Sequence, residues 1–222
     1  MFAKDYRDLA RQSLGYNWFG PVWGNYAVIE LIYLLITGAC AGLSMYAVGA
    51  VALFLVSGPF LLALAKISSL VARGFSINIE NLFDGFKRFG EAFVLYLLNT
   101  VFIFLWSLLF VIPGIIMSFA YSMSYYILND NPQMTANEAR LKSIEMMRGN
   151  KWRLFCLYLS FIGWFILCAL TFGILTVWVM PYVQTATAHF YLSLLPESVE
   201  RAPEHDAEPF DGYSSSDGTN NL

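Results

Sequence analysis

Two long stretches of the chain carry almost no charge, and they limit what it can fold into. Residues 26–71 contain two charged side chains, Glu30 and Lys66, and residues 92–128 contain none. A membrane-spanning helix needs about 20 apolar residues, so each stretch is long enough for two spans. The whole chain is 58% hydrophobic and 13% charged, whereas soluble domains are about half apolar and a quarter charged. The sequence therefore predicts an all-α, polytopic membrane protein.

Turn-forming residues divide the apolar stretches into six segments. Proline removes a backbone donor and glycine permits a tight reversal, and such residues stand near Gly42, at Pro113 and Gly114, and at Gly173. The predicted spans are residues 22–43, 46–71, 91–112, 114–128, 154–172 and 174–194. A four-span alternative would require one helix over all of residues 26–71, which is far longer than a bilayer is thick. We therefore expect six transmembrane helices arranged as three hairpins.

The Lys and Arg residues predict which side of the membrane each loop faces. Eleven of the 13 precede the first span, or lie between spans two and three or between spans four and five: Lys4, Arg7, Arg11; Arg73, Lys87, Arg88; Arg140, Lys142, Arg148, Lys151, Arg153. The three other turns contain no Lys or Arg. Because short cytoplasmic loops are enriched in these residues, both termini and every basic loop are predicted to be cytoplasmic.

Each predicted hairpin follows a segment in which apolar residues have helical spacing. These segments cover about residues 2–14, 78–90 and 135–149, and the first has the weakest pattern. In the third, Thr135 and Glu138 have the spacing of a capping box, and Gly149 stands where the helix would end. Helices with one apolar and one charged face lie along the membrane interface. We therefore expect three cytoplasmic amphipathic helices at the membrane surface.

A cationic and aromatic group follows the third of these segments: Arg148, Lys151, Trp152 and Arg153. Cations near the surface are attracted to anionic lipids, and Trp favours the interface between lipid and water. We therefore predict that these four residues are membrane-surface anchors.

The composition changes at residue 196. Residues 196–222 contain seven acidic residues and one basic residue, Arg201, with few apolar side chains. A segment of this composition cannot bury enough apolar surface to fold alone. The chain is therefore predicted to have a membrane domain at residues 1–195 and an acidic, disordered cytoplasmic tail at residues 196–222.

Five polar side chains are predicted to lie within the cytoplasmic half of the bundle: Glu30, Lys66, Asn99, Gln184 and His189. Glu30 and Lys66 fall at similar depths on neighbouring spans, so one interpretation is an ion pair. The other is that Lys66 extends to the interface while Glu30 is protonated or faces water. As a group, the five would form either a polar pocket for transport or hydrogen bonds between helices.

The chain lacks the common signatures of enzymes. It contains no HExxH, GxSxG or Walker motif, and its Cys and His residues do not have ligand spacing. The basic residues flank predicted spans, so membrane topology accounts for them and nucleic acid is not expected as a partner. We expect a protein without catalytic activity, metal or cofactor.

An ordered set of stretches carries a resemblance to a known family. They are "IPGIIMSFAYSMSYYIL", "EARLKSIEMMRGNKWRLF", "LSFIGW" and "PYVQTATAHFY", preceded by "LFDGFKRF". The chain resembles a bacterial integral-membrane family defined by a domain of unknown function numbered nine-seven-five. It has a looser similarity to the membrane domain of glycerophosphodiester phosphodiesterases. The resemblance implies a multi-pass protein of the bacterial cytoplasmic membrane and brings no established activity.

Two functional interpretations follow from these features. The first is a non-catalytic membrane protein that acts through contacts with anionic lipids, a membrane-protein partner or a homodimer, for example in envelope stress, peptide tolerance or scaffolding. The second is a small transporter or permease that uses the polar residues of the bundle. A water-accessible cavity lined by these residues would favour the second.

Overall fold

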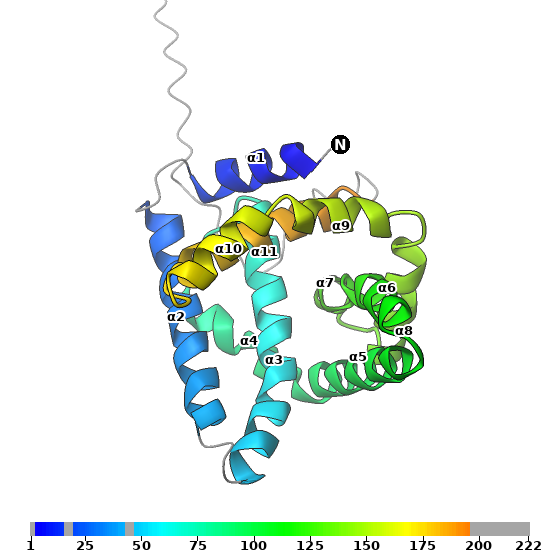
Figure 1. Cartoon of the computed structure of the whole chain (residues 1–222). Coiled ribbons are helices and arrows are strands. Elements are labelled where there is room, and N and C mark those ends of the chain that lie inside the picture. Colours follow the sequence, from blue (N-terminus) through cyan, green and yellow to red (C-terminus); the bar gives the residue numbers. More distant parts are fainter. Residues whose placement is uncertain (1–2, 16–19, 43–46, 196–222) are drawn as a thin grey trace, which may run out of the picture.

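The computed structural model describes residues 3–15, 20–42 and 47–195, and helices make up its architecture (Figure 1). In chain order they are α1 (Ala3–Leu14), α2 (Pro21–Gly42), α3 (Ala47–Ala72), the 3-10 helix η2 (Ile79–Phe83), α4 (Asp84–Lys87), α5 (Phe89–Leu109), α6 (Val111–Tyr121), α7 (Ser124–Asp130), α8 (Ala136–Met146), α9 (Lys151–Leu159), α10 (Ile162–Leu170) and α11 (Thr176–Leu192). The predicted all-α class is confirmed. Phe2, the turn at 43–46 and the acidic tail at 196–222 lie outside the described residues.

Four helical segments are long and apolar enough to cross a membrane: Pro21–Gly42, Gly49–Ala72, Phe89–Leu108 and Val111–Asp130. A fifth candidate is the pair of α9 and α10, which bends by 41° at the break between them. α11 corresponds to the sixth predicted span and has 17 residues, slightly fewer than the about 20 that a span needs. The described residues thus hold four or five helices that could span a membrane, and six spans remain a prediction.

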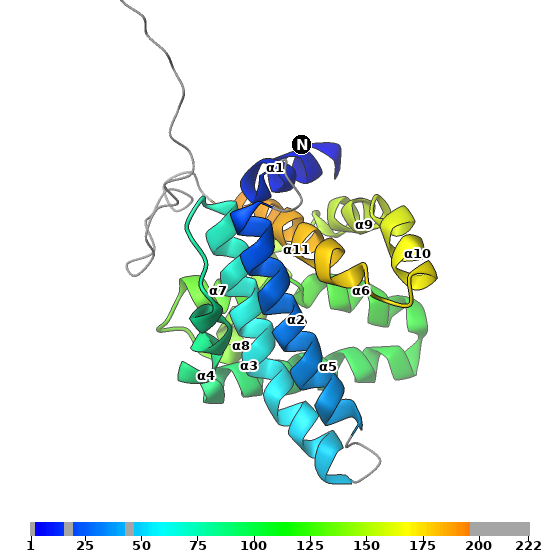
Figure 2. The same ribbon diagram turned by 90° about the vertical axis from the view of Figure 1, so that its left-hand side faces the viewer.

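The start of α2 and the ends of α3, α7 and α11 lie together, and we call this end of the molecule the base; the opposite ends of the predicted hairpins, at their turns, we call the tips. In α2 the buried residues lie between Trp23 and Glu30, and in α11 they lie between Val179 and Leu192, so both helices are buried near the base. Large apolar side chains are exposed toward the tips: Leu34, Leu35, Val51 and Leu55; Phe104, Leu108, Phe110 and Ile112; Leu170, Phe172 and Ile174. Figure 2 shows the α5–α6 hairpin lying across the direction of α2 and α3.

α5 begins against the middle of α3, where small residues allow the two backbones to approach closely. A Cβ atom at Gly58 would lie 2.7 Å from the Ala92 carbonyl oxygen, which leaves no room for a side chain there. Gly58 lies roughly 20 Å along α3 from the Ala72 end. The second hairpin therefore starts at a different level from the end of the first.

The second predicted amphipathic helix, residues 78–90, is not one helix. It is divided into η2, α4 and the start of α5, with a bend at Arg88, whose backbone angles are φ −118° and ψ 41°. α4 packs so closely on the side of α3 that a Cβ atom at Gly85 would overlap the Pro59 carbonyl oxygen. The prediction of one continuous helix was wrong here, because a close backbone contact, which sequence periodicity does not report, holds this segment against α3.

α1, the weakest amphipathic pattern in the sequence, is a helix with a clear buried face. Tyr6, Ala10 and Leu14 are buried at a spacing of four residues, which places them on one side of a helix. The Tyr6 ring lies edge-on to the Phe190 ring of α11 at 5.3 Å between centroids. The apolar face of α1 is therefore covered by other helices of the protein.

α8 has the predicted start and a different buried face. The Thr135 hydroxyl accepts from the Glu138 backbone N–H (3.4 Å) and the Glu138 carboxylate accepts from the Thr135 N–H (2.9 Å), so the capping box is confirmed. Gly149, just beyond the helix, has the left-handed φ of 83°. The buried side chains of α8 are Ala136, Ala139, Arg140 and Ser143. α8 thus packs on the second hairpin through small and polar residues.

Candidate functional site

Polar side chains from three helices meet at the base of the bundle. Asp130, at the end of α7, accepts through Oδ2 from the Arg73 guanidinium at 2.6 Å and from the Tyr191 hydroxyl at 2.9 Å. The Tyr191 ring stacks on that of Tyr126 (5.1 Å), whose hydroxyl shares a hydrogen bond of 3.3 Å with Ser68. This network joins α3, α7 and α11, and sequence analysis did not identify it.

Glu30 and Gln184 lie together, as predicted, and Tyr26 completes their group. Glu30 is 2% exposed, and its Oε2 atom has no hydrogen-bond partner. The Gln184 side chain lies near Glu30 and accepts through Oε1 from the Tyr26 hydroxyl at 2.7 Å. A carboxyl group buried in this way is costly in its charged form. Glu30 is therefore a buried carboxyl group with one oxygen that no hydrogen bond satisfies.

Lys66 does not pair with Glu30. Its ammonium group lies 3.3 Å from Oδ2 of Asp84 in α4, and the Lys87 ammonium lies 2.7 Å from Oδ1 of the same carboxylate. Partial burial alone would raise the pKa of Asp84, but hydrogen bonds from Lys87 and Asn81 and the charge of Lys66 together lower it. The packing of α4 against α3 thus gives Lys66 a partner that the sequence interpretation did not consider.

Asn99 and His189 also lie in separate groups. The Asn99 side chain donates to the Ser124 hydroxyl at 3.1 Å, which joins α5 to α7. The His189 Nε2 atom lies 2.8 Å from the Ser13 hydroxyl of α1. Of the five residues predicted to form one polar cluster, the structure brings together Glu30 and Gln184 and assigns Lys66, Asn99 and His189 to three other helix contacts.

A cavity of about 280 Å³ lies beside Gln184, among α3, α7, α9, α10 and α11, with Ser122 just after α6 also in its wall. Three tyrosines and three further polar side chains contribute to its wall: Tyr125, Tyr126, Tyr158, Ser122, Gln184 and Thr187. The Thr187 hydroxyl donates to that of Tyr158 at 3.4 Å and to the Val183 carbonyl oxygen at 2.8 Å. The run of aromatic residues near 125 in the sequence was the available signal for this cavity.

The four predicted surface anchors divide into two pairs. Trp152 is 71% exposed and stacks on Phe155 at 5.1 Å, and Arg148 is also exposed. Lys151 is half-buried, and Arg153 turns inward, where it donates to the Tyr6 hydroxyl at 2.6 Å and to Asn150 at 2.8 Å. Arg153 therefore joins α9 to α1, and Trp152 and Arg148 stay available at the surface.

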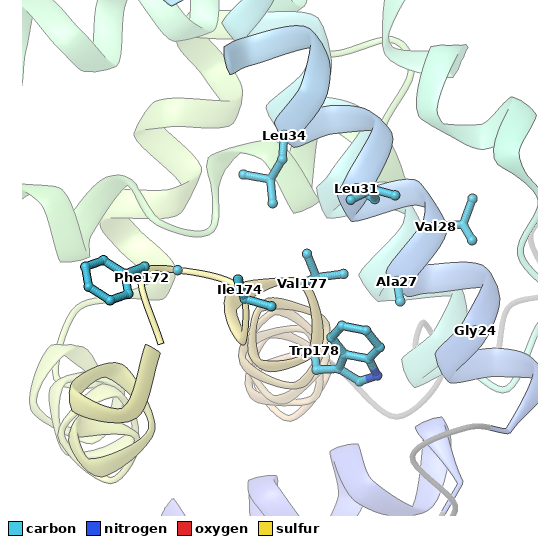
Figure 3. Close-up of a pocket in the computed structure, with 10 residues that line it drawn as sticks. Gly24, Ala27, Val28, Leu31, Leu34, Phe172, Ile174, Val177 and Trp178 are labelled. Carbon is cyan, nitrogen blue, oxygen red and sulfur yellow. The ribbon is translucent and has the colours of Figure 1, made fainter. Parts of the chain in front are cut away.

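A larger groove lies on the outside of the bundle, between α2 and the turn from α10 to α11 (Figure 3). Its volume is about 600 Å³, and apolar residues and glycines form its wall: Gly24, Ala27, Val28, Leu31, Leu34, Phe172, Gly173, Ile174, Val177 and Trp178. It is open along one side toward the tips. No residue of the predicted polar cluster contributes to it.

Comparisons with known proteins agree with one part of the resemblance. No curated protein and no solved structure gives a match, and the looser similarity to the membrane domain of glycerophosphodiester phosphodiesterases finds no support. The stretch "LFDGFKRF" lies outside the matched region, which begins at residue 108. Over residues 108–198, from the end of α5 through α11, the chain matches the family described as "Protein of unknown function (DUF975)".

Proposed function

We propose that the chain is a six-span protein of the bacterial cytoplasmic membrane, with the base of the bundle on the cytoplasmic side. The observation that carries this proposal is that the tips expose large apolar side chains and hold no charged residue. Arg7, Arg73 and Arg153 belong to the base, whereas the tips expose residues such as Leu108 and Phe172. Lipid tails accept the apolar tips, and the positive-inside rule places the cations in the cytoplasm.

In this arrangement the fifth and sixth spans differ from ordinary straight helices. The bent pair of α9 and α10 forms one span, and α11 with its flanking turn residues forms the other. A hydrophobic segment slightly shorter than the bilayer is accommodated by local thinning or by side chains that extend to the interface. The divergent hairpins expose apolar surface to lipid on several sides.

We propose further that the protein is not an enzyme and acts through contacts with anionic lipids or with a membrane-protein partner, including a second copy of itself. Roles in envelope stress, peptide tolerance or scaffolding would all use such contacts. Trp152, Arg148 and Lys142 are exposed on adjoining segments of the base, and this combination suits the headgroup region of an anionic leaflet.

Thiol labelling in intact cells tests the topology. In a variant with Cys40, Cys156 and Cys168 replaced by Ser, single cysteines are placed at Ile174, on a tip, and at Glu145, on the base. We expect an impermeant maleimide to label the Ile174 site from outside and the Glu145 site after membrane disruption. Labelling of the Glu145 site in sealed cells would contradict the proposed orientation.

Lipid analysis tests the role. Protein extracted from native membranes in a mild detergent should carry more anionic phospholipid than the membrane average, and replacing Lys142 and Arg148 by Gln should reduce that enrichment. The exposed acids Asp8 and Glu145 provide the matched control, since their replacement by Gln removes charge of the opposite sign. Identical lipid composition in wild type, variant and bulk membrane would count against a lipid-directed role.

A small transporter is the second candidate, and one observation favours it. The buried Glu30 carboxyl has an oxygen without a partner, and Gln184, which lies near it, contributes to the wall of the cavity of about 280 Å³. Ionisable groups inside a membrane usually mark a pathway. In proteoliposomes with an imposed pH gradient, transport coupled to protons would make wild-type protein dissipate the gradient faster than the Glu30→Gln variant. Equal rates would remove this candidate's support.

A further inference from the structure

The bend between α9 and α10 is formed by polar contacts, without a proline. The Ser160 backbone N–H donates to the carbonyl oxygens of Cys156 (3.0 Å) and Leu157 (3.1 Å). The next N–H, of Phe161, donates to the Tyr158 carbonyl oxygen at 3.0 Å. The backbone here therefore changes from the i→i−4 bonds of an α-helix to the tighter i→i−3 bonds. The Ser160 hydroxyl adds a bond of 2.6 Å to the Leu157 carbonyl oxygen, and side chains that bond to the backbone in this way bend helices.

A cation from α1 contacts the bend. The Arg7 Nη1 atom donates to the Ser160 carbonyl oxygen at 3.1 Å, although 153 residues separate the two in the chain. The last carbonyl groups of a helix carry partial negative charge and lack donors within the helix, so a guanidinium suits this position. Phe161, the next residue, is buried and packs edge-on against Tyr182 of α11 at 5.0 Å. Helices from both ends of the described chain thus contact the bend.

The bend also shapes the cavity of about 280 Å³. Tyr158 precedes the bend and Phe165 follows it, and both residues belong to the cavity wall. The angle of 41° between α9 and α10 therefore fixes the positions of these two rings relative to each other. Arg7 does not line the cavity. A contact outside the cavity thus determines the shape of its wall.

We propose that α1 acts as a latch on this cavity, with Arg7 as the positioning residue that holds α10 at its angle to α9. While Arg7 bonds to the Ser160 carbonyl oxygen, Tyr158 and Phe165 are held in place and limit access to the cavity. When α1 leaves, the bend loses this bond, α10 moves relative to α9 and the cavity opens. The inference goes beyond the proposed function, because it rests on contacts within the chain and not on the direction in which the chain crosses the membrane.

Two cations of α1 provide matched variants. Arg7 contacts the bend, whereas Lys4 is exposed on the same helix. Arg7→Met removes the charge and the donor and keeps an unbranched side chain, and Lys4→Met removes the same charge from the surface. Arg7→Lys is the conservative variant, because it keeps a charged donor on a flexible stem.

The reaction rate of one cysteine measures access to the cavity. In the whole chain with its three cysteines replaced by Ser, Ser122→Cys places a thiol in the cavity wall. A small, membrane-permeant methanethiosulfonate is added to this protein in phospholipid vesicles, and mass spectrometry follows the modification. We expect Arg7→Met to raise the rate by about tenfold or more, the size that corresponds to losing a hydrogen bond to a charged group. Lys4→Met should leave the rate unchanged, and Arg7→Lys should return it toward the wild-type value.

Hydrogen exchange separates a latch from a general loss of stability. A peptide covering residues 157–165 should exchange faster in Arg7→Met, while the α5–α6 hairpin should exchange as in wild type. A cysteine rate that stays level or falls in Arg7→Met would overturn the inference, as would an equal rise in Lys4→Met. Faster exchange throughout the chain would assign Arg7 to overall stability and would overturn it too.

A second variant is available if Arg7→Met does not fold. Tyr6→Phe removes the hydrogen bonds of α1 to Ser193 and Arg153 and leaves the ring on Phe190. Because this change loosens α1 while Arg7 stays intact, the rate at Ser122→Cys should again rise. A rate equal to that of the protein with Tyr6 would show that α1 does not control the cavity.

Discussion

Arg73, at the end of α3, donates to Asp130, at the end of α7, across 2.6 Å, and both side chains are largely buried at 8% and 13% exposure. The same carboxylate oxygen accepts from Tyr191 of α11. One acidic side chain thus joins segments of all three predicted hairpins.

Replacing Asp130 by Asn should therefore destabilise the fold strongly. The change removes the carboxylate that the buried Arg73 guanidinium contacts, and breaking a buried pair typically costs about 3–5 kcal/mol. Thermal unfolding of the purified protein in detergent would measure the loss. Asp8→Asn, on the exposed side of α1, is the control and should shift the midpoint little. The double variant Arg73→Met with Asp130→Leu should be more stable than Asp130→Asn, and the opposite order would contradict the argument.

The contact between α4 and Lys66 should make stability depend on pH in the acid range. The folded-state pKa of Asp84 is lowered, so its ionised form is favoured by folding. This contribution is present above the unfolded-state pKa of about 3.9 and is lost as the pH falls through the lower folded-state value. Wild type should exceed Asp84→Asn in unfolding midpoint at neutral pH, and the difference should shrink below about pH 4. A difference that does not change with pH would exclude this ion pair as its source.

Gly85→Ala should separate α4 from α3. Its Cβ atom would overlap the Pro59 carbonyl oxygen, and overpacking of this kind costs about 1–3 kcal/mol or more. Gly90→Ala is the matched control, because a Cβ atom there meets nothing within 4 Å and alanine favours helix. The unfolding midpoint should fall for the first variant and stay level or rise for the second. Equal effects would show that α4 is not held against α3.

Arg153 and Arg148 should respond differently to the same substitution. Arg153→Gln removes a charged donor from the Tyr6 hydroxyl, a change worth about 1.5–3 kcal/mol, and should loosen α1. Arg148→Gln changes an exposed side chain and should affect stability by less than about 0.5 kcal/mol. Limited proteolysis within α1 provides the readout, with faster cleavage expected for Arg153→Gln. Equal cleavage of the two variants would show that Arg153 does not hold α1 in place, and would favour its predicted role as a surface anchor.

Long apolar runs made the helices predictable, because length and hydrophobicity are properties of a local segment. The first two spans were predicted at 22–43 and 46–71, and the structure has α2 at Pro21–Gly42 and α3 at Ala47–Ala72. The break between α9 and α10 was not predicted, since "YLSFIG" at 158–163 contains no proline. Helix breaks of this kind are decided by packing as well as by composition.

The polar cluster was harder to predict because grouping its residues depended on the depth of each residue in the membrane. Counting residues from the ends of the spans assumes that all hairpins start at one level and run side by side. α5 instead starts at Gly58, partway along α3, so Asn99 reaches Ser124 rather than Glu30. Asp84 is brought to Lys66 by α4, which belongs to the segment that periodicity predicted as one amphipathic helix. Glu30 and Gln184, which lie near the ends that do converge, were placed together correctly.

The position of α1 has a consequence for the order in which the molecule is assembled. Tyr6 is synthesised before the groups that it contacts, Arg153, Phe190 and Ser193, which lie 147 or more residues later in the chain. During synthesis the apolar face of α1 therefore lacks these partners until the later predicted hairpins have been made and inserted. The docking of α1 on α11 is then a late event of biogenesis, and it joins the first described helix to the last.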